Sequence, residues 1–390
     1  MSENYHIHTQ LLHNDHKVCP STGAVSVPIH HSSTFHQNSF DEFGIYEYAR
    51  GSNPTRKALE DVIAQLEGGT RGFAFSSGMA AISTAFMLLS EGDHVLITED
   101  VYGGTYRFVT EVLPRFGIEH TFVDMTNEVE VAEKVQPNTK LIYIETPSNP
   151  TLKITDIRAM VKLAKKHNCL TFCDNTFLTP VFQRPLELGV DIVLHSATKF
   201  LGGHSDVVAG LAVVKDEELG KRLAFLQNSF GAILGVQDSW LVLRGLKTLQ
   251  VRMNASTLAA AKLAEWLNGR QEVEKVYYPG LPQHPGKEIQ EQQSTSHGAV
   301  LSFEFSSKEN AKAFVENVKL PVFAVSLGAV ETILSYPTTM SHGSMPKEER
   351  EKRGISDGLL RLSVGLEDVD DLISDFTQAL ETIESSLVKK

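Results

Sequence analysis

The sequence predicts an α/β fold in which a mainly parallel β-sheet is flanked by helices, with a smaller α+β domain at the C-terminal end. From Phe75 to about Val214, short apolar runs alternate with segments of helical periodicity, which is typical of a parallel sheet wound with helices. The length of 390 residues exceeds the usual size of one hydrophobic core, so we expect two packed units.

The elements follow from the start of the chain. Residues 1–54 lack strand or helix periodicity and predict an irregular arm. A helix should follow, because Asn53 is a suitable cap, Pro54 fits the first turn, and Gly68-Gly69 ends the apolar face. A single apolar stripe predicts another helix over Asp156–His167. The apolar runs that predict strands of the sheet are Gly72–Phe75, His94–Thr98, Glu119–Val123, Lys140–Glu145, Leu170–Asp174, Asp191–His195 and Gly210–Val214.

The C-terminal part of the chain changes pattern. Helical spacing from Ser239 to about Leu267 predicts one long helix that bridges two domains. Further strands are predicted at Val273–Tyr277, Ala299–Phe305, Thr332–Tyr336 and Leu359–Val364, with helices over Ala311–Val318 and from Asp368. We therefore expect an arm over residues 1–54, a large domain over 55–245 and a smaller domain over 246–390, without an internal repeat.

Charge and composition exclude several classes of protein. With 36 basic and 48 acidic residues the net charge is -12, which argues against a nucleic acid or an anionic membrane as partner. Neither a signal peptide nor a membrane-spanning apolar run is evident, so we expect a cytoplasmic protein. The cysteines Cys19, Cys169 and Cys173 are too few for a disulfide framework. None of the 15 histidines has the spacing of a closed metal site, so no metal is expected.

Polar residues stand at the ends of the predicted strands, where ligands gather in open α/β sheets. Ser77 follows one strand and opens a helix, so the N–H groups of Gly78 and Met79 could hold a phosphate, although an ordinary serine cap would look the same. Asn149 ends another strand and is either a site residue or a turn residue before proline. Asp174 ends a buried strand and needs a cationic partner, either a pyridinium nitrogen or a structural arginine.

Lys199 lies among small hydroxyl residues and glycines directly after an apolar run. A lysine that forms a Schiff base must lose its proton easily, so it favours such a partly desolvated pocket, whereas the alternative is a solvated surface lysine. The hydroxyls of Ser196 and Thr198 are expected to face a phosphate. An anion site, the Asp174 carboxylate and this lysine, in this order, together predict pyridoxal 5'-phosphate as cofactor.

Ordered strings along the chain match one family. They are Tyr48–Thr55, Ser77–Ala81, Val101–Thr105, Glu145–Pro150, Asp174–Thr176, Ser196–Phe200, Arg244–Leu249, Val276–Leu281 and Leu360–Gly365. With them the chain resembles the cystathionine synthase/lyase family, the Cys/Met-metabolism group of fold-type I pyridoxal phosphate enzymes, over essentially its whole length. Within the family it is most similar to the cystathionine β-lyases of Bacillus-type bacteria.

The resemblance implies roles that the residues alone do not. Tyr102 would stack on the cofactor ring, and Tyr48 and Arg50 would reach the phosphate of a neighbouring subunit, which implies a homotetramer of two catalytic dimers. Arg361 would bind the substrate α-carboxylate, for which the alternative is a surface salt bridge. Ser326 would help to place the substrate or the lysine, and Asn149 would contact both cofactor and substrate.

The resemblance also implies a reaction, with alternatives. Lys199 would remove the Cα proton of a sulfur amino acid while Asp174 keeps the cofactor ring protonated, and β-elimination of cystathionine would give homocysteine, pyruvate and ammonia. Ser335 stands where the eukaryotic-type γ-lyases carry an acidic residue, and Gly104 stands where methionine γ-lyases carry a cysteine. These two kinds of γ-lyase are therefore disfavoured. Cystathionine γ-synthase and O-acetylhomoserine sulfhydrylase stay open. A non-catalytic sensor or scaffold is disfavoured because the implied site residues are all present.

Overall fold

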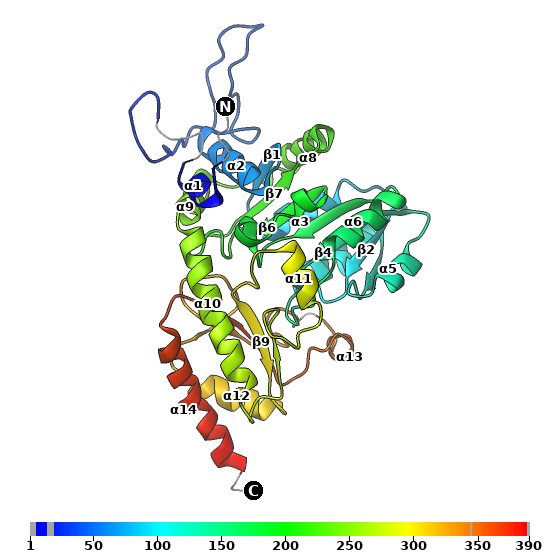
Figure 1. Cartoon of the computed structure of the whole chain (residues 1–390). Helices are drawn as coiled ribbons and strands as arrows, with labels where there is room; N and C mark the ends of the chain where they lie inside the picture. Colours follow the sequence, from blue (N-terminus) through cyan, green and yellow to red (C-terminus); the bar gives the residue numbers. More distant parts are fainter. Residues whose placement is uncertain (1–4, 14–18, 344, 388–390) are drawn as a thin grey trace. The chain divides into compact units, whose positions relative to one another are not determined.

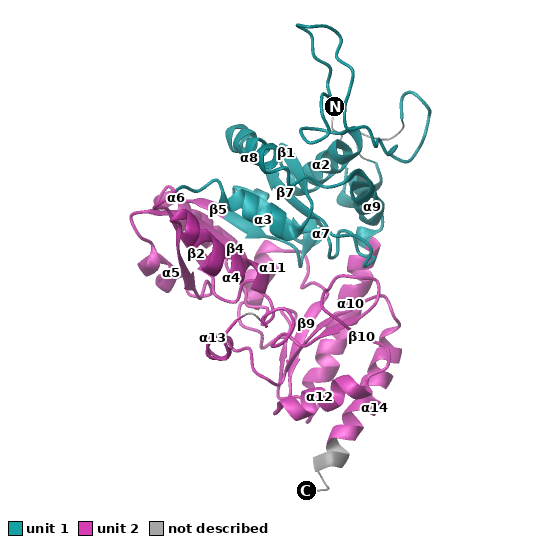
Figure 2. Ribbon diagram, turned by 180° about the vertical axis from the view of Figure 1, so that it is seen from behind, with its two compact units in different colours: residues 1–90, 172–250 teal, residues 91–171, 251–390 magenta. Residues whose placement is uncertain are grey.

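The computed structural model describes residues 5–13, 19–343 and 345–387 (Figure 1). The chain divides into two compact units, residues 1–90 with 172–250 and residues 91–171 with 251–390, which are coloured separately in Figure 2. We describe each unit by itself. The division at residues 54 and 245 stays a prediction.

Unit 1 begins with the arm and the helix that follows it. The arm holds a short helix, α1 (Ile7–Leu12), which the sequence pattern did not predict. The predicted cap of α2 (Pro54–Glu67) is confirmed, because the Asn53 side chain accepts a hydrogen bond from the Thr55 N–H at 2.9 Å. Gly68 ends the helix in the left-handed conformation, with φ of 72°.

The strands of unit 1 lie in the order β1 (Arg71–Phe75), β7 (Gly210–Val214), β6 (Ile192–Ser196) and β5 (Leu170–Asp174). β5 and β6 are parallel, whereas β7 runs antiparallel to both β6 and β1. The helices of this unit after α2 are α3 (Gly78–Phe86), α7 (Thr179–Phe182), α8 (Glu217–Phe230) and α9 (Val236–Leu246), with a 3-10 turn, η3 (Pro185–Leu188).

Unit 2 holds the remaining strands of the α/β part. β2 (His94–Thr98) lies between β4 (Thr139–Glu145) and β3 (Glu119–Val123) and is parallel to both. The elements that connect these strands are α4 (Gly103–Arg107), η1 (Phe108–Val112), η2 (Leu113–Phe116) and α5 (Glu128–Lys134), and α6 (Ile157–Lys166) follows β4.

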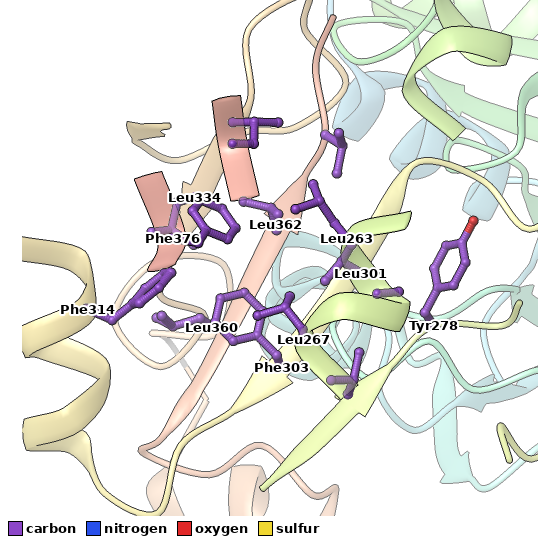
Figure 3. Close-up of a cluster of buried hydrophobic side chains, with 14 of the residues drawn as sticks. Leu263, Leu267, Tyr278, Leu301, Phe303, Phe314, Leu334, Leu360, Leu362 and Phe376 are labelled. Atoms are coloured by element: carbon purple, nitrogen blue, oxygen red, sulfur yellow. The ribbon is translucent and has the colours of Figure 1, made fainter. Parts of the chain in front are cut away.

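A second sheet in unit 2 forms the predicted α+β part of the chain. Its strand order is β10 (Val322–Phe323), β11 (Ile333–Ser335), β12 (Leu359–Ser363), β9 (Val300–Glu304) and β8 (Lys275–Tyr277). Its helices are α10 (Leu249–Asn268), α11 (Lys287–Gln293), α12 (Lys308–Asn317), α13 (Lys347–Lys352) and α14 (Val369–Leu387). Figure 3 shows the core between sheet and helices, where Phe303 of β9, Phe314 of α12 and Phe376 of α14 are almost completely buried.

The strand predictions for the sheet of the α/β part are confirmed to within one residue at each end.

The prediction of one long helix from Ser239 to Leu267 is wrong, because α9 ends at Leu246 and α10 begins at Leu249. The end of α9 packs tightly: a Cβ on Gly245 would lie 2.4 Å from the Gly202 carbonyl oxygen. The last turn of α9 thus makes a close contact with a segment that is distant in the sequence. No helix in the described ranges is both long and apolar enough to cross a membrane.

Candidate active site

The strand register of unit 1 gathers several predicted residues at one edge of its sheet. Phe75, the last residue of β1, pairs with Gly210, and Gly210 also pairs with Ser196 at the end of β6. Asp174, the last residue of β5, pairs with Leu194. The strand ends that carry Ser196 and Asp174 and lead into Ser77 therefore lie at the same edge.

The start of α3 forms the first part of this edge. The Ser77 hydroxyl caps the helix by accepting the Ala80 N–H at 3.0 Å, so it is a helix cap as well as a candidate phosphate ligand. The N–H groups of Gly78 and Met79 occupy the first helical turn, where no intrahelical acceptor exists. A Cβ on Gly78 would lie 2.9 Å from the Ser196 Cβ, so only glycine allows this approach.

Lys199 lies in a tight turn directly after β6. Its N–H donates to the Ser196 carbonyl at 3.1 Å, and its own carbonyl accepts from the Gly203 N–H at 2.8 Å. The Thr198 hydroxyl donates to the Ala209 carbonyl at 3.2 Å and accepts from the Ala209 N–H at 3.0 Å. Because its hydrogen is used in this way, Thr198 would have to exchange that bond in order to donate to a phosphate. The side chains of Lys199 and Ser196 are half-buried.

Asp174 is buried and is oriented by Thr176. Its Oδ1 accepts the Thr176 N–H at 3.0 Å and the Thr176 hydroxyl at 2.5 Å. The same hydroxyl oxygen accepts the Ser196 N–H at 2.8 Å. Thr176 therefore joins the ends of β5 and β6 and fixes the rotamer of the carboxylate. The sequence-based interpretation did not assign this role, although a hydroxyl residue two positions after an aspartate is a common turn signal.

The arm residues Tyr48 and Arg50 lie together at the surface of unit 1. The Arg50 guanidinium lies 5.5 Å from the centre of the Tyr48 ring, and Nε donates to Asn228 Oδ1 at 3.1 Å. The buried Arg56 of α2 holds this part of the arm by donating to the carbonyl oxygens of Ala49, at 2.7 Å, and Arg50, at 3.2 Å. Tyr48 is 50% exposed, so this segment presents an aromatic ring and a cation to its surroundings.

Unit 2 brings Arg361, Asn149 and Ser326 together. Arg361 lies in β12 and is 3% exposed, which excludes the alternative of a surface salt bridge. Its NH1 donates to Asn149 Oδ1 at 2.8 Å, and its NH2 donates to the Ser326 carbonyl at 2.7 Å and to the Ser335 hydroxyl at 3.1 Å. Asn149 is thus more than a turn residue.

The strand register explains this arrangement. Arg361 pairs with Ser335 on one side and Ser302 on the other. The Ser302 hydroxyl donates to the Pro150 carbonyl at 2.7 Å and so holds the turn that carries Asn149. The sequence-based interpretation considered Ser335 only as a family difference and missed its contact with Arg361.

The guanidinium of Arg361 is buried among neutral hydrogen-bond acceptors. Its hydrogen-bond acceptors are neutral oxygens, and its Nε is buried with no hydrogen-bond partner among the residues that the structure describes. Burial lowers the pKa of the guanidinium to about 10, while Tyr102 and Glu145 raise it. The group is therefore a cation below pH 9, and its Nε–H is still available to donate to an anion.

Tyr102 directly precedes α4 in the same unit. Its N–H donates to Glu145 Oε2 at 3.0 Å, and its side chain is 40% exposed, so the ring face is accessible. A Cβ on Gly103 would lie 1.9 Å from the Ser341 carbonyl oxygen, which makes glycine obligatory in this turn.

His342, which follows Ser341, is completely buried, and burial together with Arg361 lowers its pKa to about 3. It is therefore neutral near pH 7, and the sequence pattern did not single it out.

The sequence model of the Cys/Met metabolism PLP-dependent enzyme family matches residues 8–381 of this chain. The chain belongs to this family. Its cofactor is therefore pyridoxal phosphate, as the order of Ser77, Asp174 and Lys199 predicted. No group of histidine, cysteine, aspartate or glutamate side chains within the described part of the chain is arranged to hold a metal ion.

The similar proteins include both a cystathionine beta-lyase and a cystathionine gamma-lyase. The chain is 71% identical to cystathionine beta-lyase MetC of Bacillus subtilis, and the match covers 97% of each protein. It is 54% identical to cystathionine gamma-lyase of the same organism, over 96% of this chain and 99% of that protein. The crystal structure of cystathionine gamma-lyase from Lactobacillus plantarum complexed with L-serine superposes with a TM-score of 0.95 and 48% identity, covering 97% of this chain and all of that one. The predicted fold class is confirmed.

Proposed function

We propose that this enzyme hydrolytically cleaves L-cystathionine by β-elimination, giving homocysteine, pyruvate and ammonia. The observation that carries the proposal is the 71% identity with a cystathionine beta-lyase, against 54% with a gamma-lyase of the same organism. The assignment accounts for a site that must bind a polar amino acid, because a buried arginine with an available donor lies in unit 2. The physiological role would be methionine biosynthesis by transsulfuration.

The residues of unit 1 fit the cofactor. The N–H groups of Gly78 and Met79 at the start of α3, with the hydroxyls of Ser77 and Ser196, suit the phosphate. The glycine at position 78 lets the Ser196 side chain lie directly against the start of α3, so the Ser196 hydroxyl and these N–H groups are close together. Thr198 would join after exchanging its bond to Ala209.

The remaining cofactor residues would control protons. When bound, pyridoxal phosphate withdraws electrons from the substrate and makes its Cα proton acidic. The Asp174 carboxylate, fixed by Thr176, holds a proton at the ring nitrogen. Lys199 Nζ would bind the cofactor in the resting enzyme and would receive the Cα proton during turnover. By the family resemblance, Tyr102 would stack on the cofactor ring.

Arg361 orients the substrate. Its unpartnered Nε donates to the α-carboxylate, and the neutral neighbours Asn149, Ser326 and Ser335 keep the guanidinium in place without neutralising it. A carboxylate at any of these positions would compete with the substrate. This arrangement explains selection of an amino acid by its carboxylate end.

Assembly and location belong to the same proposal. Tyr48 and Arg50 of one subunit serve the phosphate of a neighbouring subunit, in a homotetramer of two catalytic dimers. Their mutual contact and their exposure on the arm support this. We place the enzyme in the cytoplasm, since its cysteines Cys19, Cys169 and Cys173 form no disulfide.

The test is to purify the holoenzyme, supply L-cystathionine and identify the keto acid by chromatography. Pyruvate in equal amount to homocysteine is expected. Formation of 2-oxobutyrate would assign a γ-lyase instead, and release of no keto acid would contradict both lyase functions.

Two lysine variants test whether turnover depends on Lys199. Lys199→Ala should lose turnover by about 10^4-fold or more, because both the cofactor bond and the proton acceptor disappear. Lys215→Ala, which removes an exposed lysine just after β7, should behave like the wild type. Substantial turnover in Lys199→Ala would remove this residue from the proton-transfer role.

A further inference from the structure

Glu67 occupies an unfavourable position for a carboxylate. It is the last residue of α2, where the helix dipole presents its negative end, and its side chain is fully buried, with 0% exposed. Both conditions cost free energy, because a carboxylate loses hydration and meets like charge. Specific contacts must therefore offset that cost.

Those contacts come from the segments that carry the candidate cofactor residues. Glu67 Oε1 lies 2.6 Å from His195 Nε2 in β6 and accepts a hydrogen bond from Asn175 Nδ2 at 3.0 Å. Asn175 in turn donates to the Gln183 carbonyl at 2.8 Å and accepts from Gln183 Nε2 at 3.1 Å. The His195 side chain is also fully buried, with 0% exposed.

The chain order places this network behind the site edge. His195 directly precedes Ser196, and Asn175 directly follows Asp174. Successive residues of an extended strand point to opposite faces, so the network holds the strand ends from the face opposite to Asp174 and Ser196. Thr176 joins the same two ends on the other side.

Stability alone does not account for the pair. Glu67 Oε2 and His195 Nδ1 are buried and have no hydrogen-bond partner among the residues that the structure describes. An apolar pair of similar volume would fill the space without these unsatisfied atoms, and such replacements are often neutral or stabilising. A buried polar pair with two unsatisfied atoms is therefore better explained by a geometric role than by stability.

We infer that Glu67 and His195 are positioning residues that fix the strand ends bearing Asp174 and Ser196, and thereby set the affinity and orientation of the bound cofactor. The inference rests on the proposed cofactor site. Partners that orient ligand residues from behind typically contribute about 10-fold to 100-fold in ligand affinity at metal sites, and we expect the lower end here.

The test compares Glu67→Leu, Glu67→Gln and His195→Gln with the wild type, each reconstituted with pyridoxal phosphate. The dissociation constant is measured by absorbance titration, and the orientation of the cofactor by its visible circular dichroism. Glu67→Leu should weaken binding by about 10-fold and reduce the dichroic band. Glu67→Gln keeps the Oε1 acceptor and should restore most of both signals.

Asp375→Asn is the matched control, because it changes another buried carboxylate, on α14, that accepts the Lys319 and Leu320 N–H groups. It should lower thermal stability without changing cofactor affinity or dichroism. If the Glu67 and His195 variants lose only thermal stability, as this control does, the positioning role is wrong. If Glu67→Leu does not fold, Glu67→Gln and His195→Gln decide by the same measurements. Failure of the wild type to bind pyridoxal phosphate would instead contradict the proposed function.

Discussion

Arg361 carries a buried positive charge that only neutral oxygens contact directly. A guanidinium in this setting binds a carboxylate strongly because neither group has to compete with water. The three donor directions used by the protein also fix the plane of the group. If Arg361 binds the substrate carboxylate as proposed, specificity for an amino acid depends on the shape of the guanidinium as well as on its charge.

Replacement of Arg361 by lysine tests this shape dependence. Arg361→Lys keeps the charge but loses the fork that contacts Asn149 and Ser326, so we expect KM for cystathionine to rise about 100-fold with a smaller change in kcat. Steady-state kinetics of pyruvate release measure both constants. Arg115→Lys, at an exposed position, is the control and should leave KM unchanged. An unaltered KM in Arg361→Lys would place the substrate carboxylate elsewhere.

His342 makes the stability of the folded chain sensitive to acid. Its pKa is about 3 in the folded protein and near 6.5 in the unfolded chain, so the unfolded state binds more protons between these values. Stability is therefore highest above pH 6.5 and falls as the pH decreases through this window. Between pH 6.5 and 5 the loss from this residue is on the order of 2 kcal/mol.

Denaturant unfolding at pH 7 and pH 5 tests the contribution of His342. His342→Gln should lose less unfolding free energy on acidification than the wild type, by on the order of 2 kcal/mol. His167→Gln, at the exposed end of α6, should show the wild-type loss. Equal acid sensitivity of wild type and His342→Gln would show that other groups control the transition.

Single residues differed in how far the sequence could predict them. The roles of Asp174 and Lys199 stay predictions: each residue alone has an ordinary structural explanation, and only their order along the chain together with Ser77 indicated a cofactor. Glu67 and His195 were not predictable as a pair, since they are 128 positions apart and only the fold brings them together. Arg361 and Ser326 came from family resemblance alone, because nothing local marks them as partners.

At the scale of elements, the start of α2 connects a helix to the arm. Asn53 caps the helix through its side-chain oxygen and donates from Nδ2 to the His30 carbonyl at 2.8 Å. One side chain thus fixes both the helix N-terminus and the preceding segment. We therefore expect Asn53 to contribute more to the free energy of unfolding than a cap at the surface does.

A comparison of two caps tests that difference. Asn53→Ala should lower the free energy of unfolding by about 2 kcal/mol, since it removes a buried cap and a second hydrogen bond. Asn127→Ala, which removes only the cap of α5, should cost about 1 kcal/mol. Urea unfolding measures both, and limited proteolysis should cleave the arm faster only in Asn53→Ala. Equal costs would mean that the bond to His30 contributes nothing.

Elements were predictable where local pattern determines them. The apolar runs located the strands of the main sheet, because they are short, are bounded by turn residues and recur between segments of helical spacing. The break between α9 and α10 was missed, since helical spacing continues from Ser239 to about Leu267. α1 was missed because six residues give too little periodicity.

At the scale of the whole molecule, the proposed exchange of arms between subunits can be tested by mixing. Lys199→Ala and Arg50→Ala should each have little activity alone. After joint unfolding and refolding, a mixed dimer would contain one site with neither substitution, so about a quarter of the wild-type activity should return. Refolding each variant separately is the control. No recovery in the mixture would mean that Arg50 serves the site of its own subunit.

The available donor on Arg361 has a practical consequence for work with this enzyme. Acetate, formate and citrate carry the same planar group that the guanidinium selects, so such buffers should act as weak inhibitors that compete with the substrate. In such a buffer the apparent KM for the substrate would be higher than its true value. The melting temperature would also be higher, because a bound anion stabilises the folded state.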